Sequence, residues 1–192
     1  MRLFVAAEPS EQVRTSALAC ARRLRERLEA GRSAEGIRWV PGANLHLTVW
    51  FLGEVSDARA SAVLGAMQPE LSVPAFDVQI AGFGAFPPSG PPRVLWMGVT
   101  RGLEALARAH EEVGTRLQPW GFAPDGRAYS AHLTVARVKD GPHGRARTAF
   151  REAIACEPAD AGVFRVRELT VFRSRTSPAG AVHEPLLRVP LR

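Results

Sequence analysis

Two copies of a His-x-Thr-x tetrapeptide are the residues of this sequence best suited to chemistry. They are His46-Leu47-Thr48-Val49 and His132-Leu133-Thr134-Val135, one in each half of a chain of 192 residues. Both lie in strand-favouring runs, so each histidine shares a strand face with its threonine. An imidazole can take or give a proton near neutral pH, and a hydroxyl can donate to an anionic oxygen. Two such pairs facing each other would supply a base, an acid and two donors around one phosphate.

The elements that carry the two motifs recur in the same order. Strand, helix, strand with the motif, helix and strand occur twice, which predicts two lobes related by a pseudo-two-fold axis with the motif strands lining the groove between them. We expect one bilobal domain over 1–192, with approximate duplicated halves 1–90 and 91–192. The expected strands are 2–7, 37–40, 44–52, 75–83, 94–100, 129–138, 162–174 and 181–190, the last two joined by a turn at 177–180, and the expected helices are 11–30, 57–71, 102–118 and 144–155.

Composition bounds the class of protein. The hydrophobic share of 46% fits a soluble globular domain, and the net charge of +6, nearly all of it from arginine, suits a polyanionic partner such as RNA. Cys20 and Cys156 have no metal-like or redox-like spacing, so we expect two reduced thiols. No signal peptide or membrane-length apolar run is visible. We therefore expect a cytoplasmic protein that does not bind membranes and acts as a monomer.

The sequence lacks the motifs of several other enzyme classes. There is no phosphate-binding loop of the kinase type and no nucleophilic serine elbow. His143 and His183 have no partner at ligand spacing, so we expect a solvated and a structural histidine there, no metal site and no cofactor. His110 falls on the apolar stripe of its predicted helix, which favours a packing role.

The motifs and their neighbours resemble the 2H phosphoesterase superfamily. Within it, the sequence is similar to the bacterial and archaeal RNA 2′,3′-cyclic phosphodiesterases, a branch first described as 2′-5′ RNA ligases. The resemblance runs from residue 2 to about residue 138, with one departure at Ala131, where the family often has proline. It rests on the segments Arg2-Leu3-Phe4-Val5-Ala6, Arg38-Trp39-Val40, Asn44-Leu45-His46-Leu47-Thr48, Phe51-Leu52-Gly53-Glu54-Val55, Gly84-Ala85-Phe86-Pro87, Arg93-Val94-Leu95-Trp96 and His132-Leu133-Thr134-Val135-Ala136-Arg137-Val138.

The residues and the resemblance together suggest a mechanism. One histidine, as general base, removes a proton from water, and the other, protonated, gives its proton to the leaving ribose oxygen, while Thr48 and Thr134 bind the non-bridging oxygens. The resemblance implies that His132 is the base and His46 the acid, that Arg137 binds phosphate, and that the product is a 2′-phosphomonoester. It also implies an α+β fold of two pseudo-symmetric lobes, each an antiparallel sheet with helices outside.

Two flanking residues do not fit a regular strand. Arg137 is offset by an odd number from His132, so an ideal strand would turn it away from the histidine face, and the strand must bulge if Arg137 is to bind phosphate. Tyr129 is also offset by an odd number, and it could either stack on a base or pack in the core. On the same alternation, Trp50 should lie on the histidine face, where the second motif has the small Ala136.

Three other functions remain open on the sequence. The chain could be a 2′-5′ RNA ligase running the reverse step. It could act on a small cyclic nucleotide such as ADP-ribose 1″,2″-cyclic phosphate. It could also be a non-catalytic RNA-binding module that kept the groove.

Overall fold

The fold was analysed in a computed structural model, which describes residues 1–31, 35–123, 126, 128–139, 141–177 and 180–192. The helices are α1 (Glu11–Ala30), α2 (Asp57–Met67), α3 (Leu103–Leu117) and α4 (Gly144–Cys156), with short 3₁₀ turns at Gly42–Asn44 and Gln118–Trp120. The strands are β1 (Arg2–Ala7), β2 (Ile37–Trp39), β3 (Leu47–Glu54), β4 (Phe76–Phe86), β5 (Val94–Arg101), β6 (His132–Val138), β7 (Asp160–Val166), β8 (Glu168–Ser177) and β9 (Gly180–Pro190).

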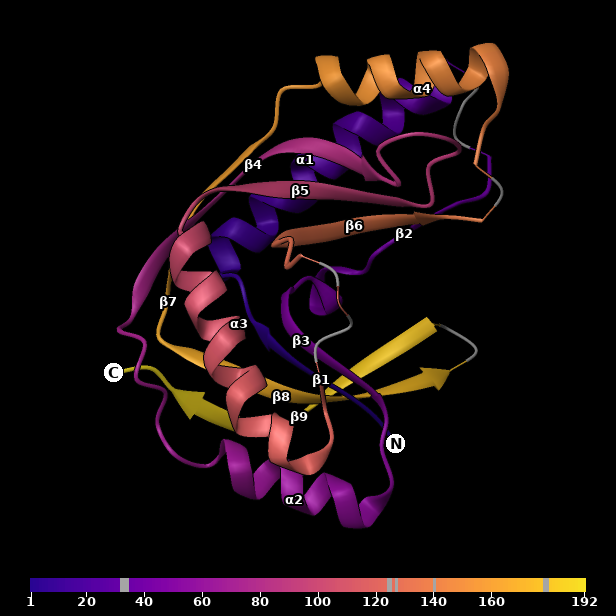
Figure 1. Ribbon diagram of the computed structural model, residues 1–192. Coiled ribbons are helices and arrows are strands. Elements are labelled where there is room, and N and C mark those ends of the chain that lie inside the picture. Colours follow the sequence, from indigo (N-terminus) through magenta and orange to yellow (C-terminus); the bar gives the residue numbers. More distant parts are fainter. Residues whose placement is uncertain (32–34, 124–125, 127, 140, 178–179) are drawn as a thin grey trace.

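The strands form one curled antiparallel sheet that divides into two lobes. The strand order is β7-β4-β5-β6-β3-β1-β8-β9, with β2 paired to β6. The upper lobe in Figure 1 holds β7, β4, β5, β6 and β2, and the lower lobe holds β3, β1, β8 and β9. The lobes join where β6 meets β3, so the two motif strands lie at the centre of the sheet. The predicted two-lobed α+β fold is confirmed.

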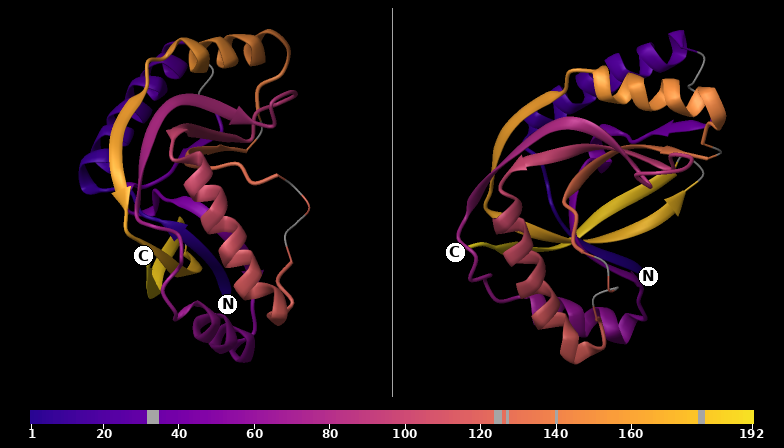
Figure 2. Two further views of the ribbon diagram at one scale, coloured as in Figure 1. Left: turned by 60° about the vertical axis from the view of Figure 1, so that its left-hand side comes forward. Right: turned by 45° about the horizontal axis from the view of Figure 1, so that its top comes forward.

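Helices cover the outer faces of both lobes. In the upper lobe α1 packs on β7 and α4 on β4, whereas α3 packs on β3 and α2 packs on α3 (Figures 1 and 2). The amphipathic pattern of α1 explains its position: Ser10 caps its N-terminus by accepting a hydrogen bond from the amide of Val13 at 3.3 Å, and one stripe of the helix is buried. The opposite, inner faces of the lobes are left to form a groove.

A single apolar core runs beneath both lobes. It includes the inward-facing motif residues Leu47, Val49, Leu133 and Val135, as the alternation of a strand requires. A second, smaller cluster of Phe4, Ala6 and Phe172 lies apart from this core. Phe4 belongs to β1 and packs on the imidazole of His46, so this second cluster forms part of the floor under the motif histidines.

The predicted strand 162–174 was wrong in one respect. It is two strands, β7 paired with β4 in the upper lobe and β8 paired with β1 in the lower lobe, because the chain leaves one lobe for the other at Arg167. Likewise β4 continues to Phe86, past its predicted end, and forms a hairpin with β5. The predicted turn at 177–180 includes Pro178 and Ala179, which lie outside the described residues.

The lobes take elements from both ends of the sequence. The upper lobe combines α1 from near the N-terminus with β7 and α4 from the C-terminal third, and the lower lobe combines β1 with β8 and β9. The division of the sequence into halves 1–90 and 91–192 therefore stays a prediction about duplication. Within the described residues, no helix has the length and apolar character needed to span a bilayer.

Candidate active site

The two motif histidines are held in the same way. His46 lies directly before β3, and its Nδ1 is 2.7 Å from the carbonyl oxygen of Asn44. His132 begins β6, and its Nδ1 is 2.8 Å from the carbonyl oxygen of Ser130. In each case the partner is the residue two positions earlier, and it fixes the proton on Nδ1 of the neutral imidazole. The Nε2 atom of each ring is thereby left as the one able to accept a proton or, once protonated, to donate it.

A local two-fold axis passes between the two motifs. Leu47 of β3 pairs with Leu133 of β6, and these are equivalent residues of the two motifs. Because the strands are antiparallel, this register places each histidine across from the threonine of the other motif. The predicted pseudo-two-fold arrangement of the motif strands is therefore present at the join of the lobes.

Both motif strands bulge at the same position. Against β1, Thr48 and Trp50 pair with successive residues, which leaves Val49 as the extra residue. Against β5, the same irregularity follows Thr134 and leaves Val135 as the extra residue. A bulge shifts the alternation of the residues that follow it. The bulge in β6 is the irregularity that Arg137 needs if its side chain is to lie on the same face as His132.

The bulges turn one exposed side chain from each strand toward the inner face. Arg137, after the bulge in β6, is exposed and close enough to both imidazoles to lower their pKa values. Phe51 is its equivalent in β3, with a side chain that is 60% exposed. Phe51 was not among the predicted site residues, because strict alternation from His46 would turn it away from the histidine face.

The same bulge corrects the prediction for Trp50. Its ring is buried against α3, where a Cβ added to Gly114 would come within 2.6 Å of the indole. Trp50 therefore packs beneath the strand instead of standing on the histidine face. Its small counterpart, Ala136, is also fully buried.

The imidazole of His46 is enclosed by other rings. The Phe4 ring is 4.7 Å away between centroids, and the His183 ring is 5.0 Å away and perpendicular. The pKa of His46 is lowered to about 4, mainly by burial and further by the neighbouring His183, His132 and Arg137, against the opposing effect of the Asn44 carbonyl. His183, on β9, was predicted to be structural, and the register of β8 with β9 brings it to the site.

The imidazole of His132 is flanked by different side chains from those around His46. Phe86 contacts it edge-on at 5.0 Å and Trp96 lies at 6.4 Å, so two aromatic residues of the upper lobe flank the ring. Burial is the main cause that lowers the pKa of His132, and Arg137 adds to it. Both histidines of the free protein are therefore biased toward the neutral form.

Tyr129 and His110 fasten the bulge of β3. The hydroxyl of Tyr129 donates to the carbonyl of Thr48 at 3.1 Å, and Nδ1 of His110 lies 2.7 Å from the carbonyl of Val49. The two rings are stacked with centroids 4.4 Å apart, so one face of Tyr129 is covered. Burial raises the pKa of Tyr129, which keeps its hydroxyl protonated as a donor. The packing role predicted for His110 is confirmed.

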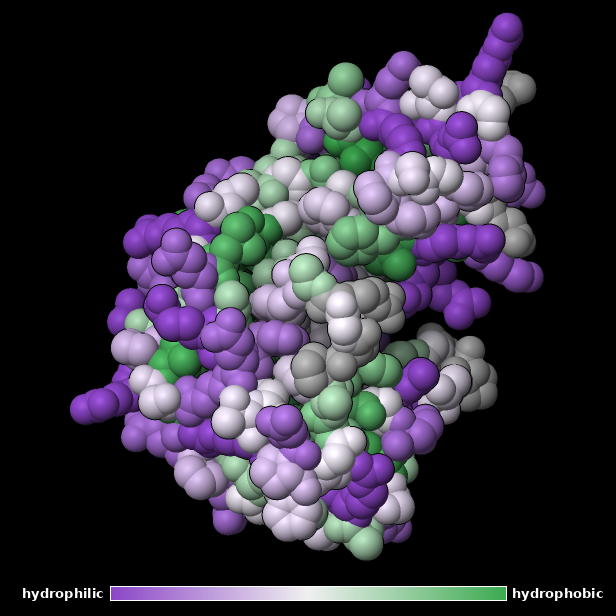
Figure 3. Space-filling model, in the orientation of Figure 1, coloured by the Kyte–Doolittle hydropathy of each residue, from purple (hydrophilic) through white to green (hydrophobic). Residues whose placement is uncertain are grey.

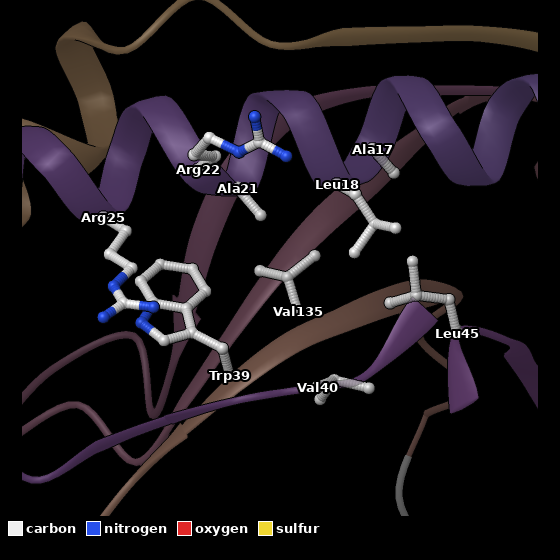
Figure 4. Close-up of a pocket in the computed structure, with 9 residues that line it drawn as sticks. All are labelled: Ala17, Leu18, Ala21, Arg22, Arg25, Trp39, Val40, Leu45 and Val135. Atoms are coloured by element: carbon white, nitrogen blue, oxygen red, sulfur yellow. The ribbon is translucent and has the colours of Figure 1, made fainter. Parts of the chain in front are cut away.

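A hollow of about 740 Å³ opens beside the motifs. Thr48 and Phe51 line it from the lower lobe, and Phe86 and His132 from the upper lobe. Figure 3 shows the surface indented between the two lobes. A second cavity, of about 220 Å³, lies on the other side of β6 beneath α1 (Figure 4). The first hollow is large enough for a nucleotide, and Thr48, Tyr129 and His132 of the predicted site residues line it, whereas His46, Thr134 and Arg137 do not.

His143, Cys20 and Cys156 do not line this hollow. His143 is exposed at the start of α4, as predicted, while Cys20 is buried and Cys156 exposed, both as free thiols. In the part of the chain that the structure describes, no group of three or more His, Cys, Asp or Glu side chains is placed to hold a metal ion.

Known proteins are similar to this chain in sequence and in fold. The sequence model of the LigT-like phosphoesterase family matches residues 15–96 and 99–183 of this chain. This chain belongs to that family. It is 30% identical to the RNA 2′,3′-cyclic phosphodiesterase of Archaeoglobus fulgidus over 187 residues, covering 97% of this chain and 98% of the relative. It is 29% identical to the Thermotoga maritima protein of the same name over 187 residues, covering 97% and 93% of the two chains. The resemblance seen in the sequence is confirmed.

Solved structures of this family carry the same fold. TT0787 of Thermus thermophilus superposes with a TM-score of 0.79 at 26% identity, covering 100% of this chain and 98% of that one. Escherichia coli LigT complexed with 3′-AMP superposes with a TM-score of 0.73 at 24% identity, covering 99% and 97% of the two chains. The fold described above is therefore that of the LigT-like phosphoesterases.

Proposed function

We propose that this protein hydrolyses RNA 2′,3′-cyclic phosphate ends to 2′-phosphomonoesters without a metal or another cofactor. The observation that carries the proposal is the pair of His-x-Thr motifs related by a local two-fold axis, each with its imidazole Nδ1 held by a backbone carbonyl. Relatives that share about 30% identity over nearly the whole chain are named for this activity. The groove is built by one chain, so we propose that a monomer acts on RNA in the cytoplasm.

The two imidazoles divide the proton transfers. His132 accepts a proton through Nε2 from the attacking water, which forms a new bond to phosphorus in line with the bond that breaks. His46, protonated on Nε2, gives that proton to the departing 3′ oxygen. Thr48 and Thr134 donate hydrogen bonds to the non-bridging oxygens as negative charge grows on them. The phosphate then remains on the 2′ oxygen.

The proton donor must be charged before it acts. With a pKa of about 4 in the free protein, His46 is neutral near pH 7. The anionic phosphate supplies what is missing, because a negative charge beside an imidazole raises its pKa. The same anion offsets the positive charge of Arg137, which lowers the pKa of both imidazoles. We propose that Arg137 binds the phosphate and that His46 gains its proton together with the substrate.

The residues around the hollow give the nucleoside one orientation. Phe51 is the exposed aromatic side chain of the hollow, and stacking on a base needs such a surface. Tyr129 lines the same hollow, and since its hydroxyl is bonded to Thr48, it offers the substrate its ring. We propose that the base lies toward these two side chains and that the phosphate lies toward Arg137.

The test is turnover of an RNA oligonucleotide that ends in a 2′,3′-cyclic phosphate, in excess chelator. We expect multiple turnovers that survive dialysis against chelator and are not increased by added Mg²⁺ or Zn²⁺. A protein that binds this RNA without turning it over would be a binding module, and a requirement for added metal would contradict the two-histidine chemistry. Adding RNA with a free 5′ hydroxyl tests the ligase alternative, since a 2′-5′ ligase would convert the cyclic end to a joined product.

A further inference from the structure

A pair of arginines lies on adjacent strands next to the motifs. In the register of β2 with β6, Arg38 pairs with Arg137, and its neighbour Trp39 pairs with Ala136. Directly paired residues of antiparallel strands point to the same side of a sheet. The guanidinium groups of Arg38 and Arg137 therefore lie on one side of the sheet.

The cavity beneath α1 fixes which side that is. Trp39 and Val135 line this cavity, and Figure 4 shows both side chains on its α1 side of the strands. Because side chains alternate along a strand, Arg38 points away from α1, toward the inner faces of the lobes. Figure 3 shows hydrophilic side chains gathered along the upper edge of the indentation between the lobes.

This pair of cations lacks an anion. Among the described residues neither Arg38 nor Arg137 makes an ion pair or a side-chain hydrogen bond, although most other arginines of the sheet are matched with Asp or Glu. Like charges directly opposite each other on neighbouring strands are destabilising. A bound polyanion would remove that cost.

The two arginines differ in their distance from the reacting groups. Arg137 lowers the pKa of both motif imidazoles, whereas Arg38 contributes to neither shift and lies on the neighbouring strand β2, roughly 4.8 Å away across the sheet. Arg93 lies directly before β5, which pairs with β6 on the edge opposite β2, and it lines the hollow. Basic side chains therefore lie on both sides of Arg137.

We propose that Arg38 binds the phosphodiester on the 5′ side of the terminal nucleotide, so that the site recognises an RNA chain and not only its cyclic end. This inference rests on the proposed function. Once the cyclic phosphate occupies the histidines and Arg137, the next anion along an RNA strand is that phosphodiester. Arginine suits it, because its planar guanidinium offers paired donors to phosphate oxygens.

The test compares three substrates with and without Arg38. They are a 2′,3′-cyclic mononucleotide, a short oligonucleotide with a 2′,3′-cyclic end, and the same oligonucleotide with a neutral methylphosphonate in place of its last phosphodiester. The variant is Arg38→Gln, with Arg38→Lys to keep the charge. The matched control is Arg108→Gln, an exposed arginine on α3. Thermal unfolding of each variant checks that the fold is retained.

We expect Arg38→Gln to lower kcat/KM for the charged oligonucleotide by about fivefold, through KM, the upper range for an exposed ion pair. For the methylphosphonate oligonucleotide and for the mononucleotide, kcat/KM of this variant should stay near the wild-type value. Arg38→Lys should restore most of the loss. The slope of log KM against log salt for the charged oligonucleotide should fall by about 0.7 in Arg38→Gln, the value for one phosphate contact on a single strand.

Two results would overturn the inference while leaving the proposed function intact. They are an Arg38→Gln variant that treats all three substrates as the wild type does, and one that loses the same factor on each of them. A wild-type protein that hydrolyses none of the three would instead contradict the proposed function itself, and this inference with it.

Discussion

The His46 side and the His132 side of the groove share one backbone and differ in their side chains. Each has an imidazole fixed by the carbonyl two residues earlier and a bulge directly after its threonine. The bulges then expose Phe51 on one side and Arg137 on the other. In the proposed mechanism, the matching backbones place the two imidazoles on either side of one phosphate, and the different side chains decide which way the nucleotide lies between them.

Removing one imidazole at a time should give the largest loss of activity. His46→Ala and His132→Ala should each lower kcat by at least about 10²-fold, the usual contribution of a general acid or base. Neither ring belongs to the main apolar core, so both variants should fold. Steady-state assays would measure the loss, with the exposed His143→Ala as the matched control. Near wild-type turnover in either folded variant would contradict the mechanism.

The next largest effects should come from removing the side chain that each bulge exposes. Arg137→Ala should lower kcat/KM by about 10- to 100-fold, because a hydrogen bond to a charged group contributes on the order of 1.5–3 kcal/mol. Phe51→Ala should lower it by about tenfold, chiefly through KM, since stacking contributes on the order of 1–3 kcal/mol per base. Both are measured on the cyclic mononucleotide. If Phe51→Ala lowers kcat by more than it raises KM, a base-stacking role would be contradicted.

Two glycines, Gly84 and Gly114, each lie close to a tryptophan ring near one of the motif strands. A Cβ at Gly84 would come within 2.2 Å of the Trp96 ring beside His132, and one at Gly114 would come within 2.6 Å of the Trp50 ring beneath β3. Each Gly→Ala change should cost about 1–3 kcal/mol of unfolding free energy through overpacking. Only Gly84→Ala should also reduce turnover. Denaturant unfolding together with the hydrolysis assay separates the two, and equal turnover in both variants would contradict the assignment of Trp96 to the site wall.

The smallest effect concerns the charge of the free histidines. NMR titration should give a pKa of about 4 for His46, well below the ordinary value of 6.5. Between pH 6.5 and 4 the unfolded chain binds a proton at this position and the folded chain does not, so the contribution of His46 to stability falls as the pH falls and levels off below pH 4. His46→Gln should flatten that part of the stability profile. A pKa of 6.5 or above in the free protein would contradict the enclosed position of the ring.

The sequence predicted the parts of the site that follow from local repetition. The two His-x-Thr motifs, their strands and the two-lobed fold could be found because alternation and duplication are visible in the sequence. Arg137 could be placed only on the condition that the strand bulges, which was stated as a requirement. The bulge itself depends on pairing with β1 and β5, so it could not be predicted for β3. That is why Trp50 was assigned to the wrong face and Phe51 was not recognised as a site residue.

Residues that reach the site through distant pairing were also missed. His183 lies beside His46 because β9 pairs with β8 and β8 with β1, a register that single-sequence patterns do not specify. The same limit applies to the strand predicted over 162–174, since its pattern does not show that the chain changes lobes at Arg167. The only sequence signal for His183 was its residue type, since few histidines occur in this chain.

The regiochemistry of the product is the most decisive test of the proposed mechanism. In that mechanism a symmetric pair of histidines acts on a nucleotide that is bound in one orientation, so that only one ribose oxygen leaves. Phosphorus NMR of the product from a 2′,3′-cyclic phosphate, compared with authentic 2′- and 3′-phosphomonoesters, should show the 2′-phosphomonoester alone. A mixture of both isomers would contradict the single orientation, and the 3′ isomer alone would contradict the proposed assignment of the leaving oxygen.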